Sequence, residues 1–184
     1  MPEKAAQKEP GKKPVPSKKP KPQQEVVVQI PLSELHPFPD HPFQVREDAS
    51  MQETAESVKE YGVLVPALAR PREDGGYELI AGHRRKHACE LAGLATMPVI
   101  VRDIDRDTAT IIMVDSNLQR ENILPSERAK AYKMKMEAIK RQGARTDLTS
   151  PKISAKFRSD DEVGQDAGVS GDTIRNYIAL TQLV

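Results

Sequence analysis

Residues 82–86 of this chain, Gly-His-Arg-Arg-Lys, place three adjacent basic side chains two positions after a glycine. The segment before them, residues 77–81, alternates as a strand does, and the segment after them is typical of a helix that ends at Gly93. A glycine between a strand and a helix leaves the first N–H groups of the helix pointing at one spot, where the helix dipole favours an anion. Three cations in a first turn oppose that dipole unless they face a negative group, so the segment predicts a phosphate-binding site.

Residues 159–183 have the pattern of a helix-turn-helix. Gly168 makes the turn, and Gly164 is the small residue needed where the two helices cross. A capping box of Ser159 and Glu162 begins the first helix. The pattern favours DNA binding over a plain helical hairpin. The inward-facing residues of the pair are Val163, Ala167, Val169, Ile174, Tyr177 and Ile178.

The second helix of this pair is expected to enter the major groove by its N-terminal end. Arg175 suits guanine and Asn176 suits adenine. Residues 151–184 carry four basic and five acidic side chains, so attraction for phosphates must come from elsewhere, and the basic helix predicted over residues 125–141 is the nearest source. The predicted DNA-contacting residues are Ser170, Gly171, Asp172, Thr173, Arg175 and Asn176, with Arg128 and Lys133 on the basic helix.

The segments that must position these two sites predict a small α/β unit followed by helices. Strands are expected at residues 26–30, at 63–71 with an interruption at Pro66, and at 97–102, and a hairpin turn is expected at 73–76. The proline-rich stretch 31–42 is expected to be an extended connection.

Three helices are expected in the same part of the chain. The first is capped by Ser50 with Glu53, buries Met51, Ala55 and Val58, and stops at Gly62. The second spans about 105–120 with Ile111, Ile112 and Leu118 inward. Pro125 opens the third, with Ala129, Tyr132, Met136 and Ile139 on its inner face, Arg128, Lys130, Lys133, Lys135 and Lys140 elsewhere, and a linker at 143–151 after it.

The composition limits the classes of function. The net charge of +1 hides an uneven distribution, because residues 1–24 hold seven Lys and two Glu and the rest of the chain is therefore near −4. That Lys- and Pro-rich tail is predicted to be disordered. Trp is absent, which argues against an aromatic-lined pocket. A lone cysteine, Cys89, forms no intrachain disulfide and is expected to pack in the core. No apolar run reaches membrane-spanning length, so a cytoplasmic protein is expected.

Several motifs in order resemble the ParB-type partition proteins, including their relatives on mobile elements. They are IPLSEL, HPFQVRE, GVLVPALAR, YELIAGHRRKHACELAG, MPVIV and SNLQRENILPSERA, followed by the helix-turn-helix. The resemblance covers about residues 26–184. It implies an α+β fold, with a basic tail at 1–24, a mixed-sheet domain at 25–122 that binds CTP, and an all-α DNA-binding domain at 123–184. It also implies that a further C-terminal dimerisation domain is absent from this chain.

The resemblance assigns residues to the nucleotide site by position. Arg84 and Arg85 would grip the triphosphate, for which guanidinium forks are well shaped, and Asn117 would lie near Mg²⁺. Val65, His83 and Ser116 replace the family's Gln, Glu and Glu, which predicts nucleotide binding with weak or no CTP hydrolysis. The implied nucleotide-binding residues are Gly62, Pro66, Gly82, His83, Arg84, Arg85, Asn117, Gln119 and Arg120.

The implied function is that of a site-specific DNA-binding protein that acts as a CTP-dependent clamp in the segregation of a chromosome, plasmid or mobile element. Its partners would be double-stranded DNA on the nucleoid, a second copy of the chain and a ParA-type ATPase, with no membrane contact. Two alternatives stay open: a transcriptional regulator with a degenerate nucleotide site, and a kinase-like enzyme on the same fold. The spacing of His83 and His87 suits a metal, but no third ligand is evident.

Overall fold

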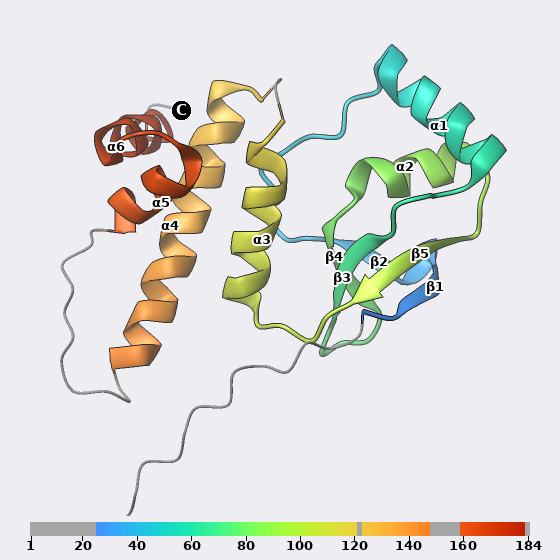
Figure 1. The fold of residues 1–184 in the computed structure, drawn as a ribbon, viewed down its shortest axis with the longest axis horizontal. Helices are drawn as coiled ribbons and strands as arrows, with labels where there is room; N and C mark the ends of the chain where they lie inside the picture. Colours follow the sequence, from blue (N-terminus) through green and yellow to red (C-terminus); the bar gives the residue numbers. More distant parts are fainter. Residues whose placement is uncertain (1–24, 121–122, 148–158, 183–184) are drawn as a thin grey trace, which may run out of the picture.

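The computed structural model describes residues 25–120, 123–147 and 159–182, and Figure 1 shows how they are arranged. The strands are β1 (Val27–Pro31), β2 (Leu35–Pro37), β3 (Ala67–Pro71), β4 (Tyr77–Ala81) and β5 (Thr96–Val101). The helices are α1 (Ala49–Tyr61), α2 (His83–Leu91), α3 (Arg106–Leu118), α4 (Pro125–Asp147), α5 (Ser159–Ala167) and α6 (Gly171–Leu180), with a short 3-10 turn at Leu32–Glu34. The predicted tail 1–24 lies outside the described residues.

The strands of the described part form one mixed sheet in the order β1-β5-β3-β4-β2. β3 and β4 make an antiparallel hairpin through the predicted turn at 73–76, while β2 runs parallel to β4 and β3 runs parallel to β5. The sequence prediction missed β2, which lies in the proline-rich connection and pairs Leu35 with Tyr77. β4, which lies between β3 and β2, has buried residues on both sides, because helices cover both faces of the sheet.

Three apolar cores hold these layers together. In the first, α1 and α2 pack on one face of the sheet, and Cys89 lies fully buried there, as predicted. In the second, α3 and α4 cover the other face around Ile80 and Met113. In the third, α5 and α6 pack on the far side of α4 around Tyr132. The α+β prediction is therefore confirmed for the mixed sheet and the helices that follow it (Figure 1).

The start of α1 differs from the prediction. Asp48, not Ser50, is the N-cap, because the Asp48 carboxylate accepts a 2.9 Å hydrogen bond from the Met51 N–H. The buried stripe of Met51, Ala55 and Val58 is confirmed, and the helix ends at Gly62, whose φ of 72° suits glycine. Ser50 is thereby released from capping and its hydroxyl faces α2.

Two expectations for α3 and α4 need correction. The buried face of α3 contains Ala109, Met113 and Val114, whereas Ile111 is half-buried and Ile112 and Leu118 pack at the edge of the core. Lys135, expected on the exposed face of α4, has only 1% of its surface exposed, because two aspartates hold its ammonium group. The linker predicted at 143–151 is wrong for residues 143–147, which continue α4, and its remainder lies outside the described residues.

The geometry of α5 and α6 follows the expected pattern. Gly168 turns the chain with a φ of 68°, and the Ser170 hydroxyl caps α6 by accepting from the Thr173 N–H at 3.2 Å. The six residues expected to face inward join the third core. The capping box of Ser159 and Glu162 involves side chains outside the described part.

Candidate functional site

The N-terminus of α2 forms directly at the end of β4. Gly82 caps the helix with a φ of 113°, a conformation that side chains disfavour. A Cβ on Gly82 would lie 2.8 Å from the Ala67 Cβ, so the glycine also permits the close contact between α2 and β3. The Gly82 carbonyl accepts the Lys86 N–H at 2.9 Å, and the N–H groups of the three residues between them lie at the open end of the helix.

Arg85 holds the loop that follows α1. One of its Nη atoms donates to the Val65 and Pro66 carbonyls, both at 2.6 Å. Burial lowers the pKa of the Arg85 guanidinium, which nevertheless stays charged. The loop between Gly62 and Pro66 is thus fixed beside the N-terminus of α2.

Arg84 turns to the start of α1. Its Nη2 donates to the Ser50 hydroxyl at 3.2 Å and lies 3.6 Å from an Asp48 carboxylate oxygen. Neither Asp48 nor Ser50 was predicted to belong to this site. No local pattern could have done so, because more than thirty positions separate them from Arg84 and only the packing of α1 on α2 brings them together.

Arg120, just past the end of α3, adds a third guanidinium to the site. Its pKa is lowered first by burial and then by the positive charges of Arg84 and Arg85. Glu127 opposes this effect, but its carboxylate already accepts the backbone N–H groups of Gln44 and Leu124 at 3.1 and 3.2 Å. Mutual repulsion among three guanidinium groups marks a site with excess positive charge, which suits an anion.

His83 lies between these arginines and the proline-rich loop. Its ring centroid is 4.0 Å from that of His41, and the Nε2 atoms of both rings are buried without a hydrogen-bond partner in the described residues. Burial, followed by the nearby His41, Arg120 and Lys86, lowers the pKa of His83 to about 3. Burial also lowers the pKa of His41, whose Nδ1 lies 2.7 Å from the Phe43 carbonyl oxygen. Both rings are therefore neutral near pH 7.

The remaining implied nucleotide residues lie at the end of α3. Asn117 is buried, and its side-chain N–H₂ donates to the Met113 carbonyl at 2.8 Å. Ser116 donates to the same carbonyl at 2.9 Å, and Gln119 is exposed. The described residues contain no group of three His, Cys, Asp or Glu side chains placed to hold a metal. His87 lies 3.3 Å from Glu47 and 3.4 Å from Glu90. The expected Mg²⁺ therefore has no carboxylate cluster here.

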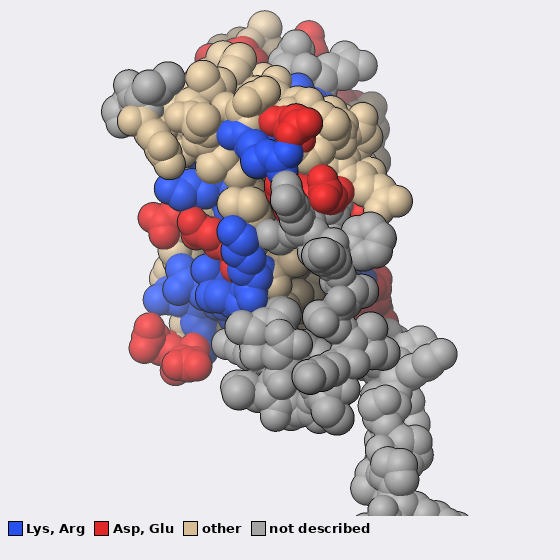
Figure 2. Space-filling view, turned by 90° about the vertical axis from the view of Figure 1, so that its left-hand side faces the viewer, with Lys and Arg blue, Asp and Glu red and all other residues tan. Residues whose placement is uncertain are grey.

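The α5–α6 pair presents fewer free side chains than predicted. Arg175 is held by ion pairs with Asp160 and Asp172. Gly171 is buried, since a Cβ there would lie 2.2 Å from an Asp161 carboxylate oxygen. Asn176 and Asp172 are exposed, and Thr173 is half-buried. On the face of the molecule that includes this pair, blue and red side chains alternate, with the largest blue group in its lower part (Figure 2).

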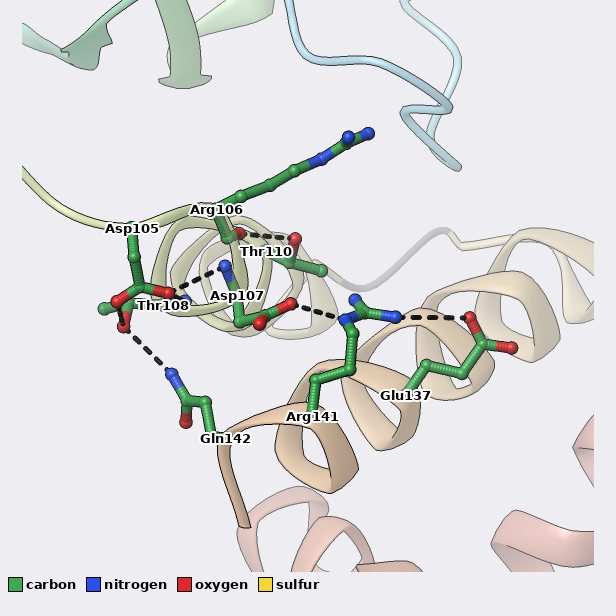
Figure 3. Close-up of polar contacts among 8 residues, drawn as sticks. All are labelled: Asp105, Arg106, Asp107, Thr108, Thr110, Glu137, Arg141 and Gln142. Carbon is green, nitrogen blue, oxygen red and sulfur yellow. Dashed lines mark hydrogen bonds and ion pairs between the residues drawn. The ribbon is translucent and has the colours of Figure 1, made fainter. Parts of the chain in front are cut away.

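The basic residues of α4 border a groove of about 1020 Å³ that lies between the loop after β2, the start of α3 and α4 itself. Lys133 lines it together with Lys130 and Arg106. Arg141 also lines the groove. Its guanidinium bonds Asp107 at 2.7 Å and lies 4.0 Å from Glu137 (Figure 3). Arg106 points away from these contacts, toward the loop (Figure 3). Arg128, the other predicted α4 contact, is half-buried.

Comparison with known proteins identifies what this architecture resembles. Residues 16–118 match the ParB N-terminal domain. The chromosome-partitioning protein Spo0J of Thermus thermophilus is 36% identical over 158 residues, covering 85% of this chain and 51% of that protein. This chain therefore spans about half the length of that relative.

A solved structure gives the same result. The C-terminally truncated ParB of Caulobacter crescentus, complexed to the centromeric parS site, aligns with a TM-score of 0.56 at 28% identity, over 84% of this chain and 71% of that chain. The same ParB complexed with CTP-gamma-S aligns with a TM-score of 0.48 at 29% identity, over 85% and 79%. Among the described residues, no helix is long and apolar enough to cross a membrane.

Proposed function

Because the chain belongs to the ParB family of chromosome-partitioning proteins, we propose that it binds a nucleotide at the N-terminus of α2 and a specific DNA site through α5 and α6. The nucleotide, CTP by the family resemblance, controls a clamp that two copies of the chain form on DNA. The observation that carries this proposal is the proximity of Arg84, Arg85 and Arg120 at the open end of α2, where the charges of Arg84 and Arg85 add to the effect of burial and lower the pKa of Arg120.

The residues present fit a triphosphate. Guanidinium forks match phosphate oxygens in two-point contacts, and the helix end offers N–H groups. Arg84 now donates a hydrogen bond to the Ser50 hydroxyl, and Arg85 donates to the Val65 and Pro66 carbonyls. At Arg84 and Arg85, a phosphate must therefore compete only with neutral protein groups and with the half-exposed Asp48.

Radiolabelled CTP binding tests the nucleotide half of the proposal, with ATP, GTP and UTP as competitors and with a DNA duplex carrying parS either present or absent. We expect CTP to bind and Arg84→Ala to abolish binding. Arg72→Ala is the matched control, because Arg72 pairs with Asp74 in the β3–β4 turn, away from α2. Absence of CTP binding by the unchanged protein under both conditions contradicts the proposal and leaves the transcriptional-regulator alternative.

The DNA half of the proposal has two different contact types. Arg175 would leave Asp160 and Asp172 to contact a base, so Arg175→Ala should cost about 1–3 kcal/mol and relax specificity at one position. Arg175→Lys keeps a positive charge near Asp160 but lacks the two-point fork, so it should lose specificity with less loss of stability. Equal affinity of the unchanged protein for parS and random DNA would contradict site-specific binding.

Lys133→Ala tests backbone contact by α4. We expect weaker binding to all sequences and a salt dependence smaller by roughly one phosphate contact, whereas Lys59→Ala on the exposed side of α1 should change neither. Hydrolysis is expected to be weak, since His83 and Ser116 stand where the family has carboxylates. A ParA-type partner and Mg²⁺ remain expectations from the resemblance. The kinase-like alternative requires phosphoryl transfer above background in the same assay.

A further inference from the structure

Two imidazoles lie side by side at the proposed nucleotide site, with their ring planes tilted by 48°. His41 comes from the loop after β2 and His83 from the first turn of α2, and their ring centroids are 4.0 Å apart. Both Nε2 atoms are buried with no hydrogen-bond partner in the described residues. Buried polar atoms are normally paired, so an unpaired couple at the mouth of an anion site indicates that a ligand supplies the missing partner.

We propose that His41 and His83 form one titratable element of the nucleotide site, and that this imidazole pair takes up a proton from solvent when a nucleotide triphosphate binds beside Arg84. The inference rests on the proposed function and adds His41 as a ligand-facing residue. The proton goes to one imidazole nitrogen, which then donates to a phosphate oxygen while the second ring remains neutral. Two neighbouring imidazoles take up one additional proton more easily than two, because two imidazolium charges would repel each other.

The charges around the pair explain why ligand and proton would bind together. Burial disfavours protonation of both rings most strongly. Arg120 from the end of α3 also disfavours it for both rings, Lys86 from α2 disfavours it for His83, and Glu127 at the start of α4 favours it for His41. Without ligand, the pair is therefore neutral. A triphosphate brings several negative charges to the same place, which cancels the effect of Arg120 and Lys86 and favours the imidazolium form.

The pH dependence follows from this linkage. Near neutral pH both rings of the unbound pair are neutral imidazoles, since burial above all lowers the pKa of His83 to about 3, and the bound pair carries up to one additional proton. Binding should therefore weaken as the pH rises through the bound-state pKa, by at most about tenfold per pH unit for one linked proton. The terminal phosphate of the ligand also titrates, at about pH 6. The unchanged protein must therefore be compared with protein variants that bind the same ligand, so that the proton of the phosphate contributes equally to each measurement.

Isothermal titration of CTP into the 184-residue protein, with the parS duplex present, measures the proton directly. The heat is measured at pH 7.5 in buffers of different ionisation enthalpy, and the slope gives the number of protons taken up. We expect a net uptake that His83→Gln and His41→Gln both reduce. His36→Gln on β2, opposite Glu78 in the sheet, is the matched control and should leave the uptake unchanged.

The outcomes separate the two proposals. If CTP binds with the same proton uptake in the unchanged protein and in both His→Gln variants, the imidazole pair is not the titrating element and the inference is wrong while the proposed function stands. The same holds if the unchanged protein binds CTP with a heat that does not depend on the buffer. If the unchanged protein binds no CTP at all, both proposals fail. A far-UV spectrum and thermal midpoint for each variant show whether lost uptake comes from lost folding.

Discussion

Replacing Gly164 by alanine should loosen α5 from α6 and remove DNA binding while sparing the nucleotide site. Gly164 lies where the two helices cross. An added Cβ would be 2.6 Å from the Val169 carbonyl oxygen, 3.1 Å from the Gly171 nitrogen and 3.1 Å from the Ser170 carbonyl carbon. All three are backbone atoms, so no change of rotamer relieves the collision. The Gly164 carbonyl also accepts the Val169 N–H at 2.8 Å, which fixes the turn in place.

The collision should reverse the usual effect of a glycine-to-alanine change on helix stability. In an exposed helix, Gly→Ala stabilises by about 1 kcal/mol. Here the nearest contact is well below the 3.4 Å at which ordinary contacts begin, and overpacking of this kind costs about 1–3 kcal/mol. A backbone contact of 2.6 Å puts the cost in the upper part of this range. After the gain in helix propensity is subtracted, we expect Gly164→Ala to lower the free energy of unfolding by about 1–2 kcal/mol, or to unfold the α5–α6 pair alone.

Gly168→Ala is the matched control, because Gly168 has a φ of 68° and no atom within 4 Å of an added Cβ. It should cost about 1–2 kcal/mol through backbone conformation without a collision. Urea denaturation, parS binding and CTP binding would be measured for both variants. A Gly164→Ala protein that is as stable as the unchanged protein and binds parS normally would refute the described helix crossing.

Three further changes have defined outcomes. Lys135→Ala should lower the free energy of unfolding, measured by urea denaturation, by about 2–4 kcal/mol. This is less than the loss from breaking a fully buried ion pair, because Asp115 and Asp166 are about half-exposed. Lys135→Met, which keeps the apolar stem, should cost clearly less, and equal costs for the two variants would contradict this. Burial lowers the folded-state pKa of His83, so the contribution of this residue to the free energy of unfolding is complete above about pH 6.5 and is lost as the pH falls toward about 3, by at most about 1.4 kcal/mol per pH unit. His83→Gln should therefore make the stability less dependent on pH in this acidic range. The same pH dependence in the variant and the unchanged protein would contradict this. Burial raises the pKa of the Cys89 thiol, so thiol reagents should react only as the protein unfolds, and rapid reaction of the native protein would contradict this.

The features that the sequence predicted correctly are those specified by neighbouring residues. The strand, Gly82 and the helix that follows it lie within seventeen positions, and Gly93 ends α2 because its N–H bonds the Glu90 carbonyl while the Leu94 N–H reaches Cys89. The α5–α6 pair is equally local. The family resemblance added expectations that spacing alone did not contain, namely a role for the residues at the end of α3 and CTP as the nucleotide. Both stay predictions.

The features that the sequence missed depend on contacts between distant segments. β2 is short and proline-rich, and only pairing with β4 makes it a strand. Asp48 and Ser50 compete for the start of α1, and the structure gives the cap to Asp48 and turns the Ser50 hydroxyl to Arg84. Lys135 has the spacing of a surface residue, yet aspartates from α3 and α5 enclose it. Its burial could not be predicted without knowing that three helices meet there.

Contacts made by α4 connect the two proposed sites. Glu127 at the start of α4 accepts the Gln44 N–H from the loop that carries His41, and its charge also acts on Arg120 in the nucleotide site. Further along the same helix, Lys135 bonds Asp166 of α5 at 2.8 Å. A triphosphate that drew Arg120 away from Glu127 would therefore act on the helix that supports the α5–α6 pair. Such a change is small at its origin, but rigid helices packed in apolar cores transmit displacement instead of absorbing it.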